Sequence, residues 1–175
     1  MTRSALAIPV LALTLAVAAC DDKTPTSPSV NPPKFTATLL STNEVPPVSA
    51  ASPESNGTGT VTITFNLTKD AAGTVTAATA DFSGTFSGFP NGTALTAAHI
   101  HPGAAGANGS PLVSLGLGGG EITFPTGTGS LTKNAISMSV DQANTILANP
   151  NGFYFNIHTA ANPGGVARGQ LVRTQ

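Results

Sequence analysis

The chain has 175 residues and a formal net charge of −1; only 9% of its residues are charged, whereas 40% are hydrophobic. This balance lacks the basic excess that nucleic-acid binding requires, and it is too apolar for a disordered protein, so we expect a folded protein without a nucleic-acid partner. The single cysteine, Cys20, excludes a disulfide within the chain and a metal site built from several thiolates.

The first residues have the pattern of an export signal. Arg3 precedes a nearly continuous apolar run over residues 5–16, and small residues then lead to Cys20. The run is shorter than the ~20 residues that a membrane-spanning helix needs. The segment resembles the signal of bacterial lipoproteins, which implies removal of residues 1–19, lipidation of Cys20 and anchoring of the protein in a membrane of the cell envelope, facing the periplasm or the cell surface. The alternative is an ordinary secretory signal in which Cys20 has no special role.

Residues 20–34 are expected to form a tether, because they are rich in Pro, Ser and Thr and carry no apolar pattern. The following residues, 35–173, suffice for one domain with its own hydrophobic core. Within this domain, hydrophobic and polar residues alternate over several short segments that Gly- and Asn-containing turns separate. The expected strands are marked by the alternating residues Phe35, Ala37 and Leu39; Val61, Ile63, Phe65 and Leu67; Val75, Ala77 and Thr79; Phe153, Phe155 and Ile157; and by a last segment from Val166 to Val172. The pattern predicts an all-β antiparallel sandwich or barrel.

One segment departs from the β pattern. Asp141 is expected to cap a short helix over residues 141–149, whose buried face consists of Ala143, Ile146 and Leu147. No other helix is predicted within the domain.

All three histidines of the chain occur in two short motifs, His99-Ile100-His101 and Asn156-Ile157-His158. Successive side chains of an extended strand point to opposite faces, so the first two histidines share a face while Ile100 enters the core. The same alternation places Asn156 and His158 opposite the apolar residues of their strand. If the two strands are neighbours, three imidazoles converge on one surface of the domain.

Four motifs occur in a fixed order along the domain: Asn43-Glu44-Val45-Pro46-Pro47, Ala98-His99-Ile100-His101-Pro102-Gly103, Asn156-Ile157-His158-Thr159, and Gly164-Gly165-Val166-Ala167-Arg168-Gly169-Gln170-Leu171. Together they resemble the CHRD domain, which is named after chordin and is widespread in bacterial secreted proteins. The resemblance covers roughly residues 35–172 and implies an immunoglobulin-like β-sandwich or barrel, distantly similar to Cu/Zn superoxide dismutase, without a settled activity. The strand with His99 and His101 is similar to a metal-binding strand of those dismutases.

The chemistry of the donor set indicates which metal to expect. Three imidazole nitrogens with an open further position suit copper or zinc, whereas magnesium and calcium prefer oxygen ligands. We therefore expect one copper or zinc ion at His99, His101 and His158. The alternative is that these histidines only hydrogen-bond to the backbone of nearby turns.

Three further polar residues belong to the candidate site. Glu44 and Asn156 are expected to support the metal ligands. Arg168 either steers an anion towards the metal or bridges strand ends through several hydrogen bonds. Val166 stands where the CHRD pattern often has a carboxylate before this arginine, so a partner for Arg168 has to come from elsewhere, and Glu44 is the candidate.

The sequence leaves enzymatic activity undecided and favours a non-enzymatic binding protein. The G-x-S-x-G, H-E-x-x-H and phosphate-loop motifs are absent, and a Ser-His-Asp arrangement with Asp81 or Asp141 depends on a proximity that the sequence does not show. The dismutase resemblance does not extend to that family's dinuclear site, which needs more histidines than three. Two functions stay open: an envelope lipoprotein that binds copper or zinc, and a metal-free extracellular module that binds a protein or polysaccharide partner.

Overall fold

The computed structural model describes residues 31–175, so the signal segment, Cys20 and most of the tether lie outside the described residues. The elements, in chain order, are β1 (Lys34–Leu40), η1 (Ser41–Asn43), β2 (Thr58–Lys69), β3 (Val75–Ser87), β4 (Thr93–Pro102), β5 (Val113–Ser114), β6 (Thr123–Phe124), β7 (Gly129–Met138), α1 (Val140–Ala148), η2 (Pro150–Gly152), β8 (Phe153–Thr159), β9 (Ala167–Gln170) and β10 (Val172–Arg173). Among these elements, no helix is long and apolar enough to cross a membrane.

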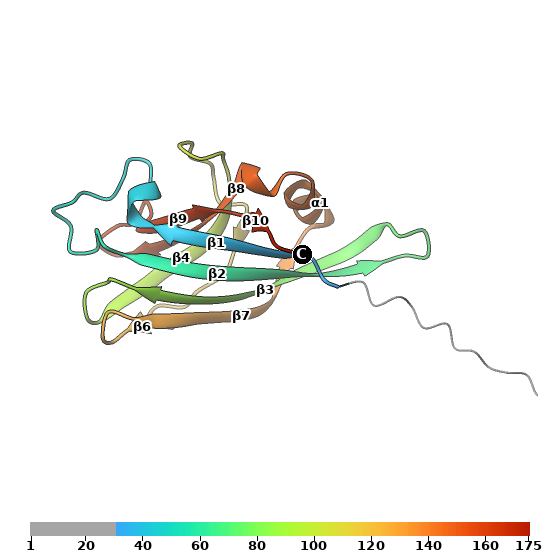
Figure 1. Ribbon diagram of the computed structural model, residues 1–175. Coiled ribbons are helices and arrows are strands. Elements are labelled where there is room, and N and C mark those ends of the chain that lie inside the picture. Colours follow the sequence, from blue (N-terminus) through green and yellow to red (C-terminus); the bar gives the residue numbers. More distant parts are fainter. Residues whose placement is uncertain (1–30) are drawn as a thin grey trace, which may run out of the picture. The chain divides into compact units, whose positions relative to one another are not determined.

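The strands form one strongly curled antiparallel sheet (Figure 1). Its order is β5-β4-β8-β9-β1-β2-β3-β7, and β10 and β6 add to β1 and β4 at the sides of this path. Because β6 also contacts β7 at the other end of the path, the sheet is a nearly closed barrel. The predicted class, antiparallel all-β with one short helix, is therefore confirmed, whereas the distant likeness to Cu/Zn superoxide dismutase stays a prediction.

The barrel interior is filled by large side chains from the inward faces of the strands. The predicted apolar faces of β1 and β2 are confirmed, since Phe35, Leu39, Ile63 and Phe65 are all fully buried. The rings of Phe82 on β3 and Phe155 on β8 lie 5.8 Å apart between centroids, although three strands separate them along the sheet. This contact crosses the interior and leaves no room for a ligand between the strands.

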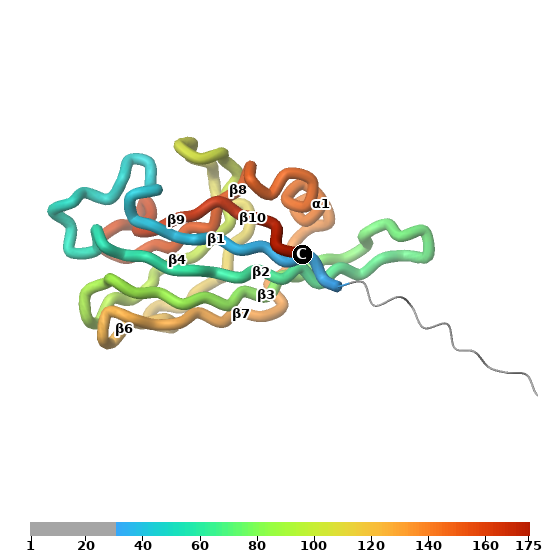
Figure 2. The backbone as a smooth tube through the Cα atoms, in the orientation of Figure 1, coloured from blue at the N-terminus to red at the C-terminus, as the bar shows by residue number. Residues whose placement is uncertain are grey.

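In β3 the predicted buried face is wrong. The even-numbered residues from 78 to 86 face the core, whereas Val75, Ala77 and Thr79 are exposed or only partly buried. The start of β3 belongs to a hairpin with β2 that extends beyond the rest of the sheet (Figure 2). Val75, Ala77 and Thr79 lie on its outward face, opposite the buried Ala78 and Ala80. Alternation is a reliable guide to burial only where one face of the strand is covered.

The helix forms where it was predicted, but its cap differs. Ser139, rather than Asp141, is the N-cap residue of α1. The Ser139 hydroxyl accepts a hydrogen bond from the Gln142 amide, and the Gln142 side chain accepts one from the Ser139 amide, at 3.1 and 2.8 Å. This capping box satisfies two backbone donors at once, which Asp141 alone would not do. Ala143 and Ile146 are fully buried in the core, as predicted.

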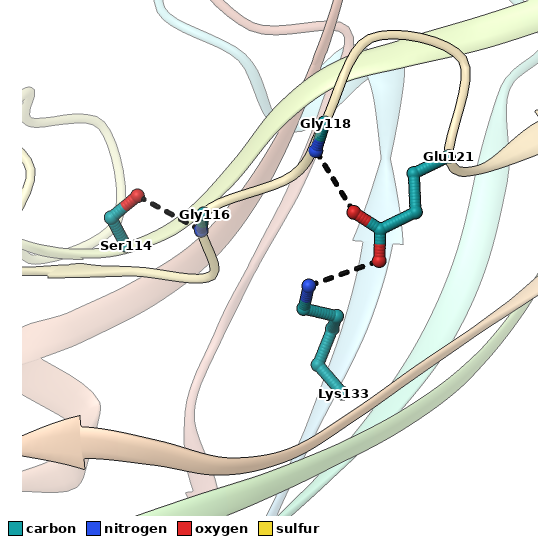
Figure 3. A network of polar contacts seen from close by, with 5 residues as sticks. All are labelled: Ser114, Gly116, Gly118, Glu121 and Lys133. Carbon is teal, nitrogen blue, oxygen red and sulfur yellow. Dashed lines mark hydrogen bonds and ion pairs between the residues drawn. The ribbon is translucent and has the colours of Figure 1, made fainter.

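A small polar network lies at the seam where the barrel nearly closes (Figure 3). Glu121, just before β6, accepts hydrogen bonds from the Lys133 ammonium group on β7 at 2.9 Å and from the Gly118 amide at 2.8 Å. In the same loop, the Gly116 amide donates to the Ser114 hydroxyl. The glycine-rich loop 116–120 is thus fastened to the edge strand β7, which the sequence pattern did not reveal.

Gly169 allows β9 and β1 to approach each other closely. A Cβ atom at this position would lie 2.1 Å from the carbonyl oxygen of Thr38, a backbone atom that cannot rotate away. We expect Gly169→Ala to lower the free energy of unfolding by about 2–3 kcal/mol, because the strands must separate to admit one methyl group. Urea titration of both proteins measures the difference.

Gly164→Ala is the matched control, since a Cβ at Gly164 meets no atom within 4 Å. Its effect should stay within about 0.5 kcal/mol. Equal stability of the two variants would show that β1 and β9 are not held at this distance in solution.

Candidate metal centre

The pairing of β4 with β8 brings the three histidines together. The strands are antiparallel neighbours, with Ala97 opposite His158, His99 opposite Asn156 and His101 opposite Tyr154. Ile100 is fully buried on the inward face, as predicted, so the histidines lie outside the barrel. One ring nitrogen from each histidine lies within 4.8 Å of the other two.

The site is less open than the predicted surface position implied. His101 and His158 are only 5% and 8% exposed, and His99 alone is partly exposed. Two loops account for this burial, because the carbonyl groups of Gly109 and Pro163 hydrogen-bond to His101 and His158 respectively. The three imidazoles therefore form a half-enclosed cluster whose open side is at His99.

The hydrogen bonds to these loops determine which ring nitrogens carry protons. His101 Nδ1 lies 2.9 Å from the Gly109 oxygen, and His158 Nδ1 lies 3.0 Å from the Pro163 oxygen. A carbonyl oxygen can only accept, so each Nδ1 donates and each neutral ring keeps the lone pair on Nε2. His158 Nε2 then accepts from His99 Nδ1 at 3.1 Å. Metal-binding histidines in proteins typically have their second nitrogen fixed in this way.

Burial keeps the imidazoles neutral. Desolvation, followed by the charges of His158 and His101, lowers the pKa of His99 to about 4. Desolvation is also the main cause of the lowered pKa of His101 and of His158. At neutral pH all three rings are therefore neutral, and each has one lone pair for a cation.

The distances fit a single ion after a small closure. Nitrogens bound to one tetrahedral zinc at 2.0–2.1 Å are about 3.3 Å apart, close to the 3.1 Å between His99 Nδ1 and His158 Nε2. An ion between these two atoms requires the proton of His99 to move from Nδ1 to Nε2. The wider separations, up to 4.8 Å, require a contraction of about 1.5 Å. Of the three rings, His99 alone has no hydrogen bond to the backbone within the described part of the chain. The centroids of His101 and His158 lie farthest apart, at 6.0 Å, so closure onto one ion also involves the loops that hold these two rings.

The strongest indication of a missing partner is at His101. Its Nε2 atom is buried and has no hydrogen-bond partner among residues 31–175. A turn-binding histidine would be satisfied through Nδ1 alone, and its Nε2 would normally reach water or another polar group. A lone pair buried beside two other imidazoles fits a metal ligand better.

Arg168 bridges two loops instead of forming an ion pair. Its guanidinium donates to the carbonyl of Asn43 at 2.6 Å, to that of Ala107 at 3.1 Å, and to the side chain of Asn108 at 2.8 Å. The guanidinium also lies 4.5 Å from the centroid of Tyr154, while His101 stacks on the same ring at 4.9 Å with only 4° between planes. Since β8 lies between β4 and β9, Tyr154 separates the arginine from the histidine.

Glu44 and Asn156 meet beside this layer. Asn156 donates to Glu44 at 3.3 Å, and both residues are at least 95% buried. Desolvation raises the pKa of Glu44 to about 7, although the charge of Arg168 and the Asn156 hydrogen bond both favour the ionised form. Glu44 is thus close enough to Arg168 to feel its charge, but it is not within the 4.0 Å of an ion pair in the described structure.

Sequence reasoning missed Glu54 entirely. Its buried carboxylate accepts hydrogen bonds from Thr159 at 2.7 Å and Asn162 at 2.5 Å, and it thereby fastens the loop that carries Pro163. The sequence offers no signal for this contact, because Glu54 lies over a hundred residues before its partners. Asp81, by contrast, takes no part in the histidine cluster. Its carboxylate accepts hydrogen bonds from the Asn66 side chain on β2 and from the Ala135 amide on β7.

The fold is a nearly closed antiparallel β-barrel with a layer of buried polar side chains over β4, β8 and β9. A protein-family model, the CHRD domain, matches residues 35–171. The chain therefore belongs to the CHRD domain family, and this membership suggests a binding or interaction module. Comparison with curated proteins and with solved structures gives no match.

Replacing Glu44 tests the cost of burying its carboxyl group. Because its pKa is raised from 4.5 to about 7, the folded protein holds a proton that the unfolded chain loses between these values, so stability falls as pH rises through this window. Glu44→Gln cannot ionise. We therefore expect the free energy of unfolding of Glu44→Gln, relative to that of the parent, to be about 1–2 kcal/mol higher at pH 8 than at pH 5.

Chemical denaturation at both pH values measures this difference. Glu121→Gln is the control, because the pKa of the exposed Glu121 is lowered by the Gly118 amide and by Lys133. The free energy of unfolding of this variant, relative to that of the parent, should not be higher at pH 8 than at pH 5. A Glu44→Gln effect that is the same at both pH values would mean that the Glu44 carboxyl group does not titrate in this window.

Proposed function

We propose that this protein is a lipoprotein of the bacterial cell envelope whose CHRD domain binds one copper or zinc ion through His99, His101 and His158. The buried, unpartnered Nε2 of His101 carries the proposal, because it faces a cluster of neutral imidazoles. We propose binding without catalysis as the role of the domain. The metal-free interaction module remains the competing function, and the experiment below separates the two.

The division of roles among the three histidines supports a metal site. His101 and His158 are oriented by backbone carbonyls before any ion arrives, so their side-chain entropy is already lost in folding. His99 is bound only to another ring and is partly exposed, so it can move onto an entering ion. Two fixed ligands and one adjustable ligand suit a site that takes up and releases its ion.

The ligand chemistry supports copper or zinc over the alkaline-earth ions. Three imidazoles without a carboxylate ligand provide nitrogen donors of intermediate softness. Copper and zinc bind such donors well, whereas calcium and magnesium prefer oxygen. Neutral ligands also leave the charge of the ion uncompensated. The partly ionised Glu44 is the nearby group that would offset this charge through Asn156.

Removal of the histidines should abolish metal binding without unfolding the domain. We expect residues 20–175, carrying Cys20→Ser, to bind one equivalent of Cu(II) or Zn(II) in calorimetry. The triple variant His99→Ala, His101→Ala and His158→Ala should bind at least about 100-fold more weakly, because all three ligands are lost. Lys133→Ala, at the barrel seam, is the surface control. A parent protein that binds neither ion would favour the interaction module.

The membrane anchor is tested separately in the full chain. Expressed in a bacterium, the parent should sediment with membranes and leave them only in detergent, since the attached lipid holds it there. Cys20→Ser should appear in the soluble exported fraction or retain its signal segment. A Cys20→Ala control should behave like the serine variant. If both variants sediment as the parent does, Cys20 is not the anchor.

A further inference from the structure

Tyr154 is the only tyrosine of the chain, and its ring lies directly against the histidine cluster. It is paired with His101 across strands β8 and β4, and both side chains lie on the face opposite the core residues Ile100 and Phe155. Directly opposite residues of antiparallel strands have side chains within contact distance, so this register brings the two rings together. The rings stack with 4.9 Å between centroids and 4° between planes. The phenol ring therefore sets the plane of the His101 imidazole.

The hydroxyl group of Tyr154 holds the loop that makes the second contact with His101. It accepts a hydrogen bond from the Gly109 amide at 3.3 Å. The carbonyl group of the same glycine accepts one from His101 Nδ1 at 2.9 Å. Tyr154, Gly109 and His101 thus form a closed cycle of one ring stack and two hydrogen bonds. A displacement of any member disturbs the contacts of the other two.

The backbone of this loop can come close to both rings because two of its residues are glycines. A Cβ atom at Gly109 would overlap the carbonyl oxygen of Pro102, a backbone atom that cannot rotate away. A Cβ atom at Gly103, at the start of the loop, would lie 3.1 Å from Tyr154 Cε1. Larger residues at these positions would therefore push the loop away from the cycle.

Arg168 supports the other face of the tyrosine ring. Its guanidinium carbon lies 4.5 Å from the ring centroid, and both residues are 2% exposed. A cation over an aromatic ring is attracted more strongly when both groups are withdrawn from water. The same guanidinium donates to the Ala107 carbonyl and to the Asn108 side chain, the two residues that precede Gly109. One arginine thus holds both the ring and the loop.

We infer that Tyr154 is a positioning residue of the histidine cluster, which fixes the ring orientation and the tautomer of His101. This role rests on the proposed metal site, because its consequence is that His101 keeps the lone pair of Nε2 for an ion. The ring stack alone allows the imidazole to turn over within its own plane. The hydroxyl group prevents this, since it holds the Gly109 carbonyl that selects Nδ1–H as its donor.

Tyr154→Phe separates the two contributions of the side chain, because it keeps the ring stack and removes only the hydroxyl group. Long-range proton–nitrogen NMR correlations of the metal-free protein report which nitrogen of each histidine carries the proton. We expect the ratio of Nε2-protonated to Nδ1-protonated His101 to rise about fivefold in this variant, the factor that corresponds to the typical net strength of one hydrogen bond. His158 should keep its proton on Nδ1, because the Pro163 carbonyl holds it independently.

Thr159→Val is the matched control. It also removes a buried hydroxyl group from β8, one that donates to Glu54 at 2.7 Å and accepts from the Asn162 amide. A general loosening of the strand would change the tautomer ratio of His101 in both variants. A positioning role confines the change to Tyr154→Phe, so the ratio should keep its parental value in Thr159→Val.

Metal affinity provides the second readout. Calorimetry with Zn(II) should show about three- to fivefold weaker binding by Tyr154→Phe than by the parent, with the same stoichiometry, because part of the binding free energy must then orient His101. A parent that binds no Zn(II) would contradict the proposed function but not the positioning role, since the nitrogen spectra are recorded without metal.

Three results would overturn the positioning role of Tyr154. The first is a His101 tautomer ratio that is the same in Tyr154→Phe as in the parent. The second is an equal change of this ratio in Thr159→Val. The third is equal Zn(II) affinity of the parent and Tyr154→Phe, because the orientation of His101 would then not matter to the ion.

Discussion

Strand β8 is buried on both of its faces, so the polar side chains on its outer face need hydrogen-bond partners from other parts of the chain. All seven of its residues are buried. Phe155 and Ile157 point into the apolar interior, where burial is favourable without further partners. Asn156 and His158 point outward beneath loops, where each polar atom must find a hydrogen bond or lose the free energy of its hydration. Loops from distant parts of the chain supply these hydrogen-bond partners in the outer layer.

Those loops satisfy most of the layer, and the exceptions are concentrated. The buried side-chain atoms without partners in the described part of the chain are Glu44 Oε1, His101 Nε2, Asn156 Oδ1 and Arg168 Nη2. All four belong to the outer layer over β4, β8 and β9 or to the turn beside it. Native proteins tolerate such atoms where function, rather than stability, determines the residue. A domain that is otherwise well satisfied thus departs from good packing at the place where ligands are expected.

The sequence predicted the parts of this arrangement that depend on local periodicity. Alternation identified β1, β2 and β8 and placed the histidines on the face opposite Ile100, because each of these strands has one face against the core. It failed for the start of β3, where the even-numbered residues face the core, and for β7, whose exposed edge position leaves only two of its ten residues buried. Register between β4 and β8 depends on strand pairing, which no short motif reports.

The details of the site were not accessible to such reasoning for a different reason. The carbonyl groups of Gly109 and Pro163 orient the histidines, yet every residue has a carbonyl, so nothing in the sequence marks these two. Likewise, the sequence left two roles open for Arg168, and its hydrogen bonds to two loops, without a carboxylate within 4.0 Å among the described residues, follow from three-dimensional distances. Residue type identified the candidates, and tertiary contacts determined their protonation and their partners.

The position of the histidine cluster outside the barrel follows from how the interior is filled. Phe82 and Phe155 meet across it, and Phe35 packs on Phe65 at 4.8 Å between ring centroids, so the interior holds side chains and no cavity for a ligand. Successive residues of β8 consequently point alternately into the core and into the outer layer. Loop substitutions can then alter the chemistry over β8 with little effect on the core, because the backbone of the strand separates the two. The outward residues of β4, β8 and β9 are thus the part of the domain that can acquire a ligand while the barrel keeps its stability.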